Sequence, residues 1–396
     1  MKHSYKKYLL PLLLMGSLAP AHAQHTLVGG DDVLEISGRV STFYNLRFLK
    51  AGEEDKKNNR FKVRDLIIGL DGRHKNTWEY ELKVDLADLA SNAGASSAFD
   101  PENPGLMSAY VAYKGLPFEI KMGYDKLPYS MFMLTSLDHT LYWQRPQMLR
   151  GEFFSMRDAG ITLSQDLWQK KIKLYAGIYT GMGEQIVALD ESDASARPEY
   201  VGRVEFAYPA PYKMREIDMT HVPKPMFRIG ANARYTNKTQ PNGESISSDL
   251  TGDFGIKMVD GKRLAYGLDA SFQYQGFSLQ AEYQRMDMKP QNTSDALYNN
   301  TTEAQNGGVI HAGGCVVQAN YHVKPIRTAI SMRYEYYNPN DLEVGHAERL
   351  SAAAGYYFPG SGAAVKVHYY HILKEDQNSE PVKWTDQLRF GVYYNF

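Results

Sequence analysis

The segment Gln387–Phe396 (QLRFGVYYNF) alternates strictly between two kinds of side chain. One parity carries the apolar and aromatic residues Leu388, Phe390, Val392, Tyr394 and Phe396, and the other carries Gln387, Arg389, Gly391, Tyr393 and Asn395. Successive side chains of a β-strand point to opposite faces, so a period of two predicts a strand with one apolar and one polar face.

The same period recurs along the chain in runs of about 9 to 12 residues, which is the length that a tilted strand needs to cross a bilayer. In the clearest runs, at 78–86, 264–274 and 328–336, small and polar residues share one face. We predict sixteen strands, at 33–47, 61–71, 77–87, 106–114, 117–124, 156–164, 170–179, 198–208, 226–236, 263–274, 277–287, 310–322, 327–337, 347–358, 363–373 and 385–396.

The gaps between these strands alternate in length. Most of the long gaps follow odd-numbered strands, at 88–105, 125–155, 180–197, 237–262 and 288–309, and most of the short ones follow even-numbered strands, at 72–76, 115–116, 275–276 and 323–326. Short periplasmic turns and long extracellular loops are typical of transmembrane antiparallel β-barrels of the outer membrane. The long, proline-rich link at 209–225 breaks this rule, and we interpret it as an elaborated periplasmic turn.

The N-terminal segment has the three parts of a secretory signal peptide. Lys2, Lys6 and Lys7 precede an apolar stretch at 8–18, which ends in the small-x-small sequence Ala21–Ala23. The stretch is shorter than the roughly 20 apolar residues of a spanning helix, which argues against an uncleaved anchor. We therefore predict a signal peptide at 1–23, export in a Gram-negative cell, and one barrel domain at 24–396 without a separate plug.

The composition excludes several classes of protein. Without the three lysines of the signal, 41 basic side chains face 45 acidic ones, and a chain that is slightly acidic does not favour nucleic acid as a partner. A single cysteine, Cys315, cannot form an intramolecular disulfide. No run in the mature chain approaches 18 apolar residues, which excludes helical spanning but not a barrel. Many of the 29 tyrosines stand at predicted strand ends, as in the aromatic girdles of membrane barrels.

An ordered series of motifs resembles the phosphate-selective porins O and P. The motifs are IGLDG at 68–72, WEYEL at 78–82, AYVAY at 109–113, GYDKLP at 123–128, YGL at 266–268 and GFSLQAEY at 276–283. The resemblance implies a homotrimer of sixteen-stranded barrels in outer-membrane lipid, each with a water-filled pore that a folded-in third loop narrows. It implies passive diffusion of small anions. The aromatic strand that ends in Phe396 also resembles the closing strand that the barrel assembly machinery recognises.

The third long gap, at 125–155, is the candidate constriction loop. Its length suits a loop with a function, and it carries charges of both signs. Opposed charges across a narrow opening filter solutes by charge, although a salt bridge that holds the loop to the wall is the simpler role for any one of them. The candidate constriction residues are Lys126, Asp138, Arg145, Arg150 and Glu152, with His139, Tyr142 and Trp143 between them.

The strand alternation also predicts which charged side chains face the lumen. The candidate pore-lining basic residues are Arg39, Lys83, Lys121, Arg203, Arg228, Arg333 and Arg389, and Lys173, Arg234, Arg349 and Lys366 share their parity. The acidic residues on the same face are Glu35, Asp65, Glu79, Glu81, Asp85, Glu119, Glu205, Asp269, Glu282 and Glu335. We therefore expect a lumen of mixed charge.

One segment departs from the phosphate-channel pattern, which carries clustered arginines just before the Ile-Gly-Leu motif. Here the sequence is KVRDLI at 62–67, and the alternation places Asp65 and Ile67 inward, with Lys62 and Arg64 on the opposite parity. A carboxylate at that place repels phosphate. We therefore predict a porin for small hydrophilic solutes, with anion preference as a hypothesis.

Two other functions stay open. A barrel enzyme needs a nucleophile or base constellation, but His368 and His371 have opposite parity and no Gly-x-Ser-x-Gly occurs. A surface adhesin or scaffold with a closed pore is the second alternative. The histidines are not at ligand spacing with carboxylates or thiols, so we predict no metal and no cofactor.

Overall fold

The structure is a computed structural model of the whole chain. It describes residues 25–52, 59–87, 105–136, 140–149, 156–181, 198–213, 215–238, 246–247, 257–258, 261–289, 309–338, 346–374 and 384–396. The predicted signal peptide at 1–23 lies outside these residues, as does most of each long gap between predicted strands.

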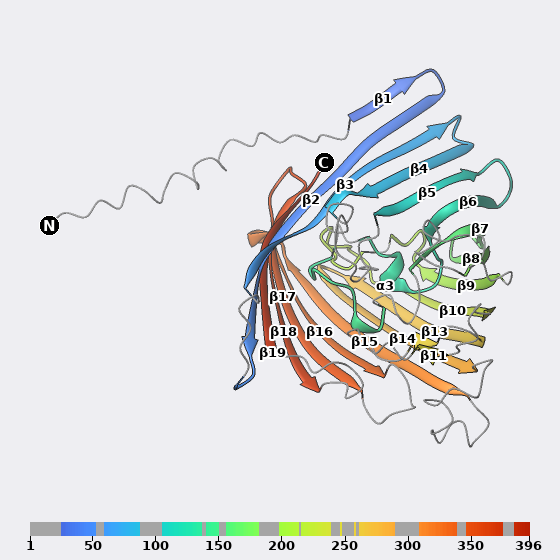
Figure 1. Ribbon diagram of the computed structural model, residues 1–396. Coiled ribbons are helices and arrows are strands. Elements are labelled where there is room, and N and C mark those ends of the chain that lie inside the picture. Colours follow the sequence, from blue (N-terminus) through green and yellow to red (C-terminus); the bar gives the residue numbers. More distant parts are fainter. Residues whose placement is uncertain are drawn as a thin grey trace.

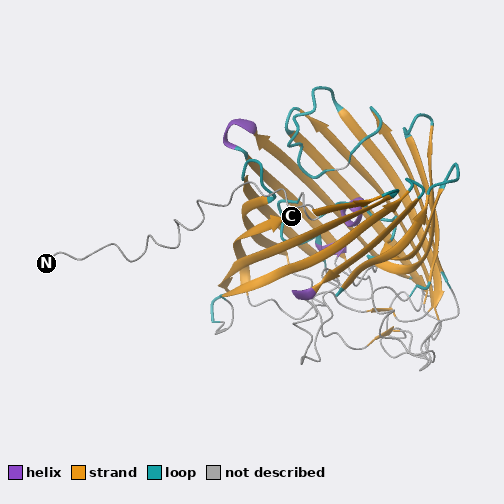
Figure 2. Ribbon diagram, turned by 90° about the horizontal axis from the view of Figure 1, so that it is seen from above, coloured by secondary structure: helices purple, strands orange, loops and turns teal. Residues whose placement is uncertain are grey.

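Within the described residues, sixteen antiparallel strands form a closed barrel (Figures 1 and 2), as the period-two pattern predicts. Each strand pairs with the next along the chain, and the last pairs with the first. The strands are β2 (Asp32–Leu49), β3 (Arg60–His74), β4 (Trp78–Asp85), β5 (Leu106–Tyr113), β6 (Glu119–Lys126), β7 (Arg157–Leu167), β8 (Ile172–Tyr179), β9 (Glu199–Tyr208), β10 (Met226–Lys238), β13 (Gly261–Tyr274), β14 (Phe277–Lys289), β15 (Ile310–Val323), β16 (Thr328–Asn338), β17 (Ala347–Tyr357), β18 (Ala363–Lys374) and β19 (Trp384–Asn395).

A few short elements lie outside this ring of strands. β1 (His25–Gly29) forms a hairpin with the first residues of β2, and β11 (Ile246–Ser247) pairs with β12 (Lys257–Met258). The short helices are α3 (Met131–Leu134), η2 (Gln147–Leu149) and η5 (Lys324–Ile326). None of the described helices has the length and apolar character that crossing a membrane requires.

The two faces of the wall differ as the alternation predicts. On β13, Leu264 and Leu268 are exposed on the outside of the barrel, whereas Ala265 and Asp269 are buried inside it. On the closing strand, Phe390 points outward and Arg389 inward. Each strand therefore gives the barrel an apolar belt outside and a largely polar lining inside.

The seam of the barrel closes at Phe396. Its backbone exchanges two hydrogen bonds with Gly38 of β2, with N···O distances of 2.9 and 3.0 Å. A Cβ atom on Gly38 would lie 2.3 Å from the Phe396 ring, so the ring occupies the space of the missing side chain. A larger residue at position 38 would therefore have to displace the Phe396 ring.

The prediction for Arg64 is wrong, because β3 contains a β-bulge. The pairing of β2 with β3 shifts between Ser41 and Thr42, so that Arg64 becomes an extra residue in the ladder. Its side chain is buried instead of lying on the outer parity, and its Nη1 atom lies 3.3 Å from an Asp65 carboxylate oxygen. Arg39 approaches the same carboxylate at 3.3 Å. Asp65 therefore faces the lumen as predicted, but with two guanidinium groups beside it.

Candidate pore and its constriction

The third loop folds into the barrel, where α3 lies inside the ring of strands (Figure 1). Its apolar residues pack against apolar positions on the inner wall and form one buried cluster. The loop contributes Leu127, Tyr129, Met131, Phe132, Met133, Met148 and Leu149, and the wall contributes Tyr179, Val201, Ala265, Met286, Met288, Ile310, Ala312, Val316 and Tyr337. The third loop stays inside the otherwise polar lumen because apolar side chains of the loop and of the wall are buried against each other.

A charged network anchors the first part of the loop. Arg203 of β9 makes a bidentate ion pair with Asp269 of β13, at 2.6 and 2.9 Å, and pairs with Glu205 at 2.6 Å. The same guanidinium donates a hydrogen bond to the backbone carbonyl of Tyr129 in the loop, at 2.6 Å. Arg228 of β10 pairs with the same two carboxylates and is buried with them. Arg203 therefore connects the loop to the wall, and Arg228 shares its two carboxylate partners within the wall.

The second part of the loop is held by aromatic and cationic contacts with β16 and β18. The Arg333 guanidinium stacks on the Tyr142 ring at 3.6 Å, and Ser331 donates a hydrogen bond to the Tyr142 hydroxyl at 2.9 Å. Burial raises the pKa of that hydroxyl, so it stays neutral at ordinary pH. Lys366 donates a hydrogen bond to the Thr140 carbonyl and faces the Trp143 ring at 5.6 Å.

The long link between β9 and β10, residues 209–225, also enters the lumen, from the rim that carries the short turns. The backbone carbonyl of Glu216 accepts hydrogen bonds from Gln280 of β14 and Asn320 of β15, at 2.9 and 3.0 Å. Ile217 is buried in a cluster that includes Tyr142 and Trp143. The interpretation of this link as an elaborated turn missed that it reaches the third loop.

A cavity of about 410 Å³ remains between the third loop and the wall of β2 to β7. Five basic and two acidic side chains line it, together with polar and backbone groups that include the end of the chain. The basic residues are Arg39, Lys83, Lys126, Arg145 and Arg157, and the acidic residues are Glu81 and Asp125.

The structure places the predicted site residues in three groups. The first group lines the cavity and consists of Arg39, Lys83, Lys126 and Arg145. Lys121 does not line the cavity, but it pairs with Asp125, which does. Arg203, Arg228, Arg333 and Arg389 are buried on the lumenal face, and Arg389 faces the rings of Phe43 and Tyr370 at 5.1 and 5.2 Å. Asp138, Arg150 and Glu152 lie outside the described residues.

One lining residue, Arg157, was not predicted. It stands at the start of β7, directly opposite Lys126 in the β6–β7 ladder, at the place where the loop leaves the wall and returns to it. Arg157 falls within the predicted strand at 156–164, but it shares the parity of the outward residues Ile161 and Leu163, so the alternation does not place it in the lumen. Its pairing with Lys126, a predicted constriction residue, is the feature that places Arg157 at the cavity.

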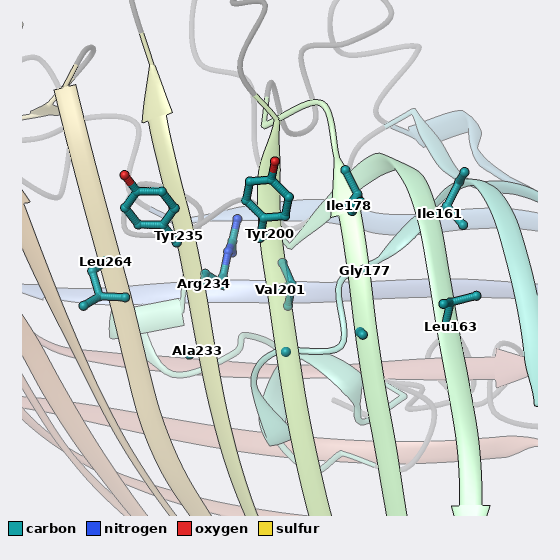
Figure 3. Close-up of a pocket in the computed structure, with 12 residues that line it drawn as sticks. Ile161, Leu163, Gly177, Ile178, Tyr200, Val201, Ala233, Arg234, Tyr235 and Leu264 are labelled. Atoms are coloured by element: carbon teal, nitrogen blue, oxygen red, sulfur yellow. The ribbon is translucent and has the colours of Figure 1, made fainter.

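A second hollow, of about 490 Å³, lies on the outside of the wall (Figure 3). Its floor contains the small residues Ala176, Gly202 and Ala233, and larger residues such as Ile178 and Tyr235 surround them. Ile178 and Tyr235 are exposed on the outer face, so this hollow is not part of a passage through the lumen. In the described part of the chain, no group of three or more His, Cys, Asp or Glu side chains is placed to hold a metal ion.

A closed sixteen-stranded barrel with an apolar outer belt, a polar lining and a loop folded into its lumen defines an outer-membrane porin. The comparison with family models agrees, since the model of the phosphate-selective porin O and P family matches residues 34–396. The chain belongs to this family.

Solved porin structures share the fold at low sequence identity. An anion-selective porin from Comamonas acidovorans aligns with a TM-score of 0.59 at 12% identity, over 92% of this chain and 100% of that one. OmpT of Vibrio cholerae gives a TM-score of 0.58 at 10% identity, over 94% and 100%. OmpF of Salmonella typhi gives 0.58 at 14% identity, over 94% and 100%. No curated protein matches the sequence.

Proposed function

We propose that this porin passes small hydrophilic solutes by passive diffusion through the cavity beside the third loop, and that it prefers anions. The charge balance of that cavity carries the proposal, since five basic side chains line it against two acidic side chains and the terminal residue Phe396 with its α-carboxylate. Rings of Arg and Lys favour anions in narrow pores because the low-dielectric wall focuses the field on the solute.

The ion pairs of Asp65 support the same preference. We expected this carboxylate to repel phosphate, but Arg39 and Arg64 both lie 3.3 Å from it. The two guanidinium groups neutralise the Asp65 carboxylate, and the buried carboxylate of Asp85 belongs to the same group of charges. Phosphate is therefore a candidate solute, together with other small anions.

The remaining parts of the proposal concern export and assembly. We propose that residues 1–23 are a cleaved signal peptide, that the barrel assembly machinery recognises the strand ending in Phe396, and that three copies associate in outer-membrane lipid. One solved structure of Vibrio cholerae OmpT is described as a trimer, which supports the last point by fold likeness.

Two measurements on the refolded wild-type barrel test the proposed function. We expect liposomes that contain it to swell with small sugars, and a planar bilayer in a salt gradient to show a reversal potential of anionic sign. Phosphate should block part of the chloride current. Swelling without anion preference would contradict the selectivity, and the absence of any swelling would favour the closed scaffold. Lipase or protease activity would favour the enzyme.

Replacing Lys83 by Gln should weaken the anion preference about threefold, because a unit charge about 7 Å from the solute contributes about 0.6 kcal/mol at the dielectric constant of water. The Lys83 ammonium lies 2.6 Å from Glu81 and 3.1 Å from Asp71, so its loss also leaves two carboxylates less neutralised. The chloride-to-potassium permeability ratio at low salt measures the effect. Lys262→Gln, the same change at an exposed position of β13, is the control and should leave the ratio unchanged.

A further inference from the structure

The β9–β10 link buries an acidic side chain inside the barrel, between the wall and the third loop. Glu216 is 2% exposed and Ile217 is 1% exposed, although both belong to a connection between two strands. Asp218 shapes the link around them, since its carboxylate accepts hydrogen bonds from the backbone N–H groups of Val222, at 3.0 Å, and Gly276, at 2.8 Å. A buried connection of this kind must satisfy its polar groups inside the protein.

The Glu216 side chain joins the wall to the third loop. Its Oε1 atom accepts a hydrogen bond from the backbone N–H of Leu141, at 3.1 Å, and another from the Gln318 amide of β15, at 2.6 Å. Ile217 adds apolar contact, because it shares one buried cluster with Leu141, Tyr142 and Trp143. The link therefore contacts the loop segment 140–144 on the side of β14 and β15. The loop itself leaves and rejoins the wall on the other side, at β6 and β7.

We propose that the β9–β10 link is the second half of the pore constriction, and that Glu216 is a positioning residue that sets the upper size of the diffusing solute. The link contacts β14 and β15 and the loop segment contacts β16 and β18, whereas the cavity lies on the other side, beside β2–β7. The inference rests on the proposed function, because a size limit exists only in a pore that conducts.

The charge state of Glu216 is part of this arrangement. Burial raises the pKa of its carboxyl above the usual range, although the Arg333 guanidinium and the Lys366 ammonium act in the opposite direction. The charged and titratable groups around it are Arg333 from β16, Lys366 from β18, Tyr357 from β17 and Tyr142 from the third loop, with Arg215 and Asp218 on its own link.

The sign of the pH effect follows from that raised pKa. We call the link docked when Glu216 contacts Leu141 and Gln318, and released when these contacts are broken. At a pH between the usual carboxyl pKa and the raised one, Glu216 is protonated in the docked link and ionised in the released link. Docking is therefore strongest at acidic pH and weakens as the pH rises through the raised pKa. We therefore expect the wild-type pore to widen as the pH rises. In Glu216→Gln, the part of the pH dependence that comes from the Glu216 carboxyl should be lost.

Glu216→Ala tests the proposal directly. It removes the acceptor for Leu141 and Gln318, so we expect larger sugars to enter liposomes and single-channel conductance to rise about twofold, since conductance follows the narrowest cross-section. Glu216→Gln keeps an oxygen acceptor and should retain the wild-type sugar cut-off. Glu79→Ala is the matched control, because that lumenal carboxylate pairs with Lys114 at 2.6 Å and does not line the cavity.

The outcomes separate this inference from the proposed function. A wild-type barrel that admits no sugar would contradict the proposed function itself. A conducting wild type with the same cut-off in Glu216→Ala would contradict only the role of Glu216. If Glu216→Ala does not assemble, the pH series on wild type and Glu216→Gln decides: identical pH profiles of conductance would overturn the proposal.

Discussion

Replacing Arg203 by Met should release the first part of the third loop and raise single-channel conductance. The substitution removes the donor to the Tyr129 carbonyl and leaves Asp269 and Glu205 with one guanidinium instead of two. Breaking a buried ion pair from one side costs roughly 3–5 kcal/mol when the remaining charge has no partner, and we expect a smaller loss here because Arg228 stays beside both carboxylates. We therefore also expect a lower melting temperature of the folded barrel, measured by the loss of its heat-modifiable gel mobility.

Arg228→Met separates these two effects. Arg228 pairs with the same carboxylates, at 2.8 Å from Glu205 and 3.4 Å from Asp269, but its hydrogen bonds in the structure go to the wall and not to the loop. Both variants should melt earlier, and only Arg203→Met should change the conductance and the sugar cut-off. Equal conductance in the two variants would show that the Tyr129 carbonyl contact does not hold the loop.

The barrel could be predicted from the sequence because its wall repeats a simple physical requirement. A strand of such a wall presents apolar side chains outside and mostly polar or small ones inside, so the period of two is visible along most of the wall. β13 shows this directly, with Leu264 and Leu268 outside and Ala265 and Asp269 inside. Strand ends agree to within a few residues, since the flanking turns are rich in Gly, Asn and Pro.

Alternation fails where the ladder gains a residue. Arg64 stands in a β-bulge of β3, and a bulge changes the parity of everything before it without leaving a clear signal in the sequence. The shift turns an arginine that was expected outside into a partner of Asp65. The same shift pairs Lys62 with Phe43, which is buried inside the barrel, so the expectation of an outer parity for Lys62 is also wrong. Both basic residues change the charge expected near the Asp65 carboxylate.

The docking of the third loop had a signal that the predictions did not use. Several apolar residues have the inward parity of polar neighbours such as Glu282, namely Met286, Met288, Ile310 and Val316. Apolar side chains are not expected to face a water-filled lumen. Such residues on an inner wall indicate that another segment covers them. The same reasoning does not find the β9–β10 link, whose main partners on the wall are the polar residues Gln280, Gln318 and Asn320.

The closing strand gives the last prediction, which concerns assembly. Replacing Phe396 by Ala should lower the amount of folded barrel about fivefold, since fully burying a Phe side chain contributes roughly 1.5–3 kcal/mol and the Phe396 ring is only half-buried. The ring covers Gly38 at the seam between β19 and β2, and its loss exposes the hydrogen-bonded strand end. The fraction of heat-modifiable protein in the outer membrane measures the effect, and reversal potentials of the barrels that do form should match wild type.

Two further variants distinguish the seam from general loss of an aromatic side chain. Phe390→Ala removes the same residue type from the same outward face of β19, but away from Gly38, and should assemble at close to the wild-type level. Gly38→Val keeps Phe396 and fills the space that its ring occupies, so it should reproduce the assembly defect. If Phe396→Ala assembled normally while Gly38→Val did not, backbone pairing at Gly38 and not the terminal ring would close the barrel.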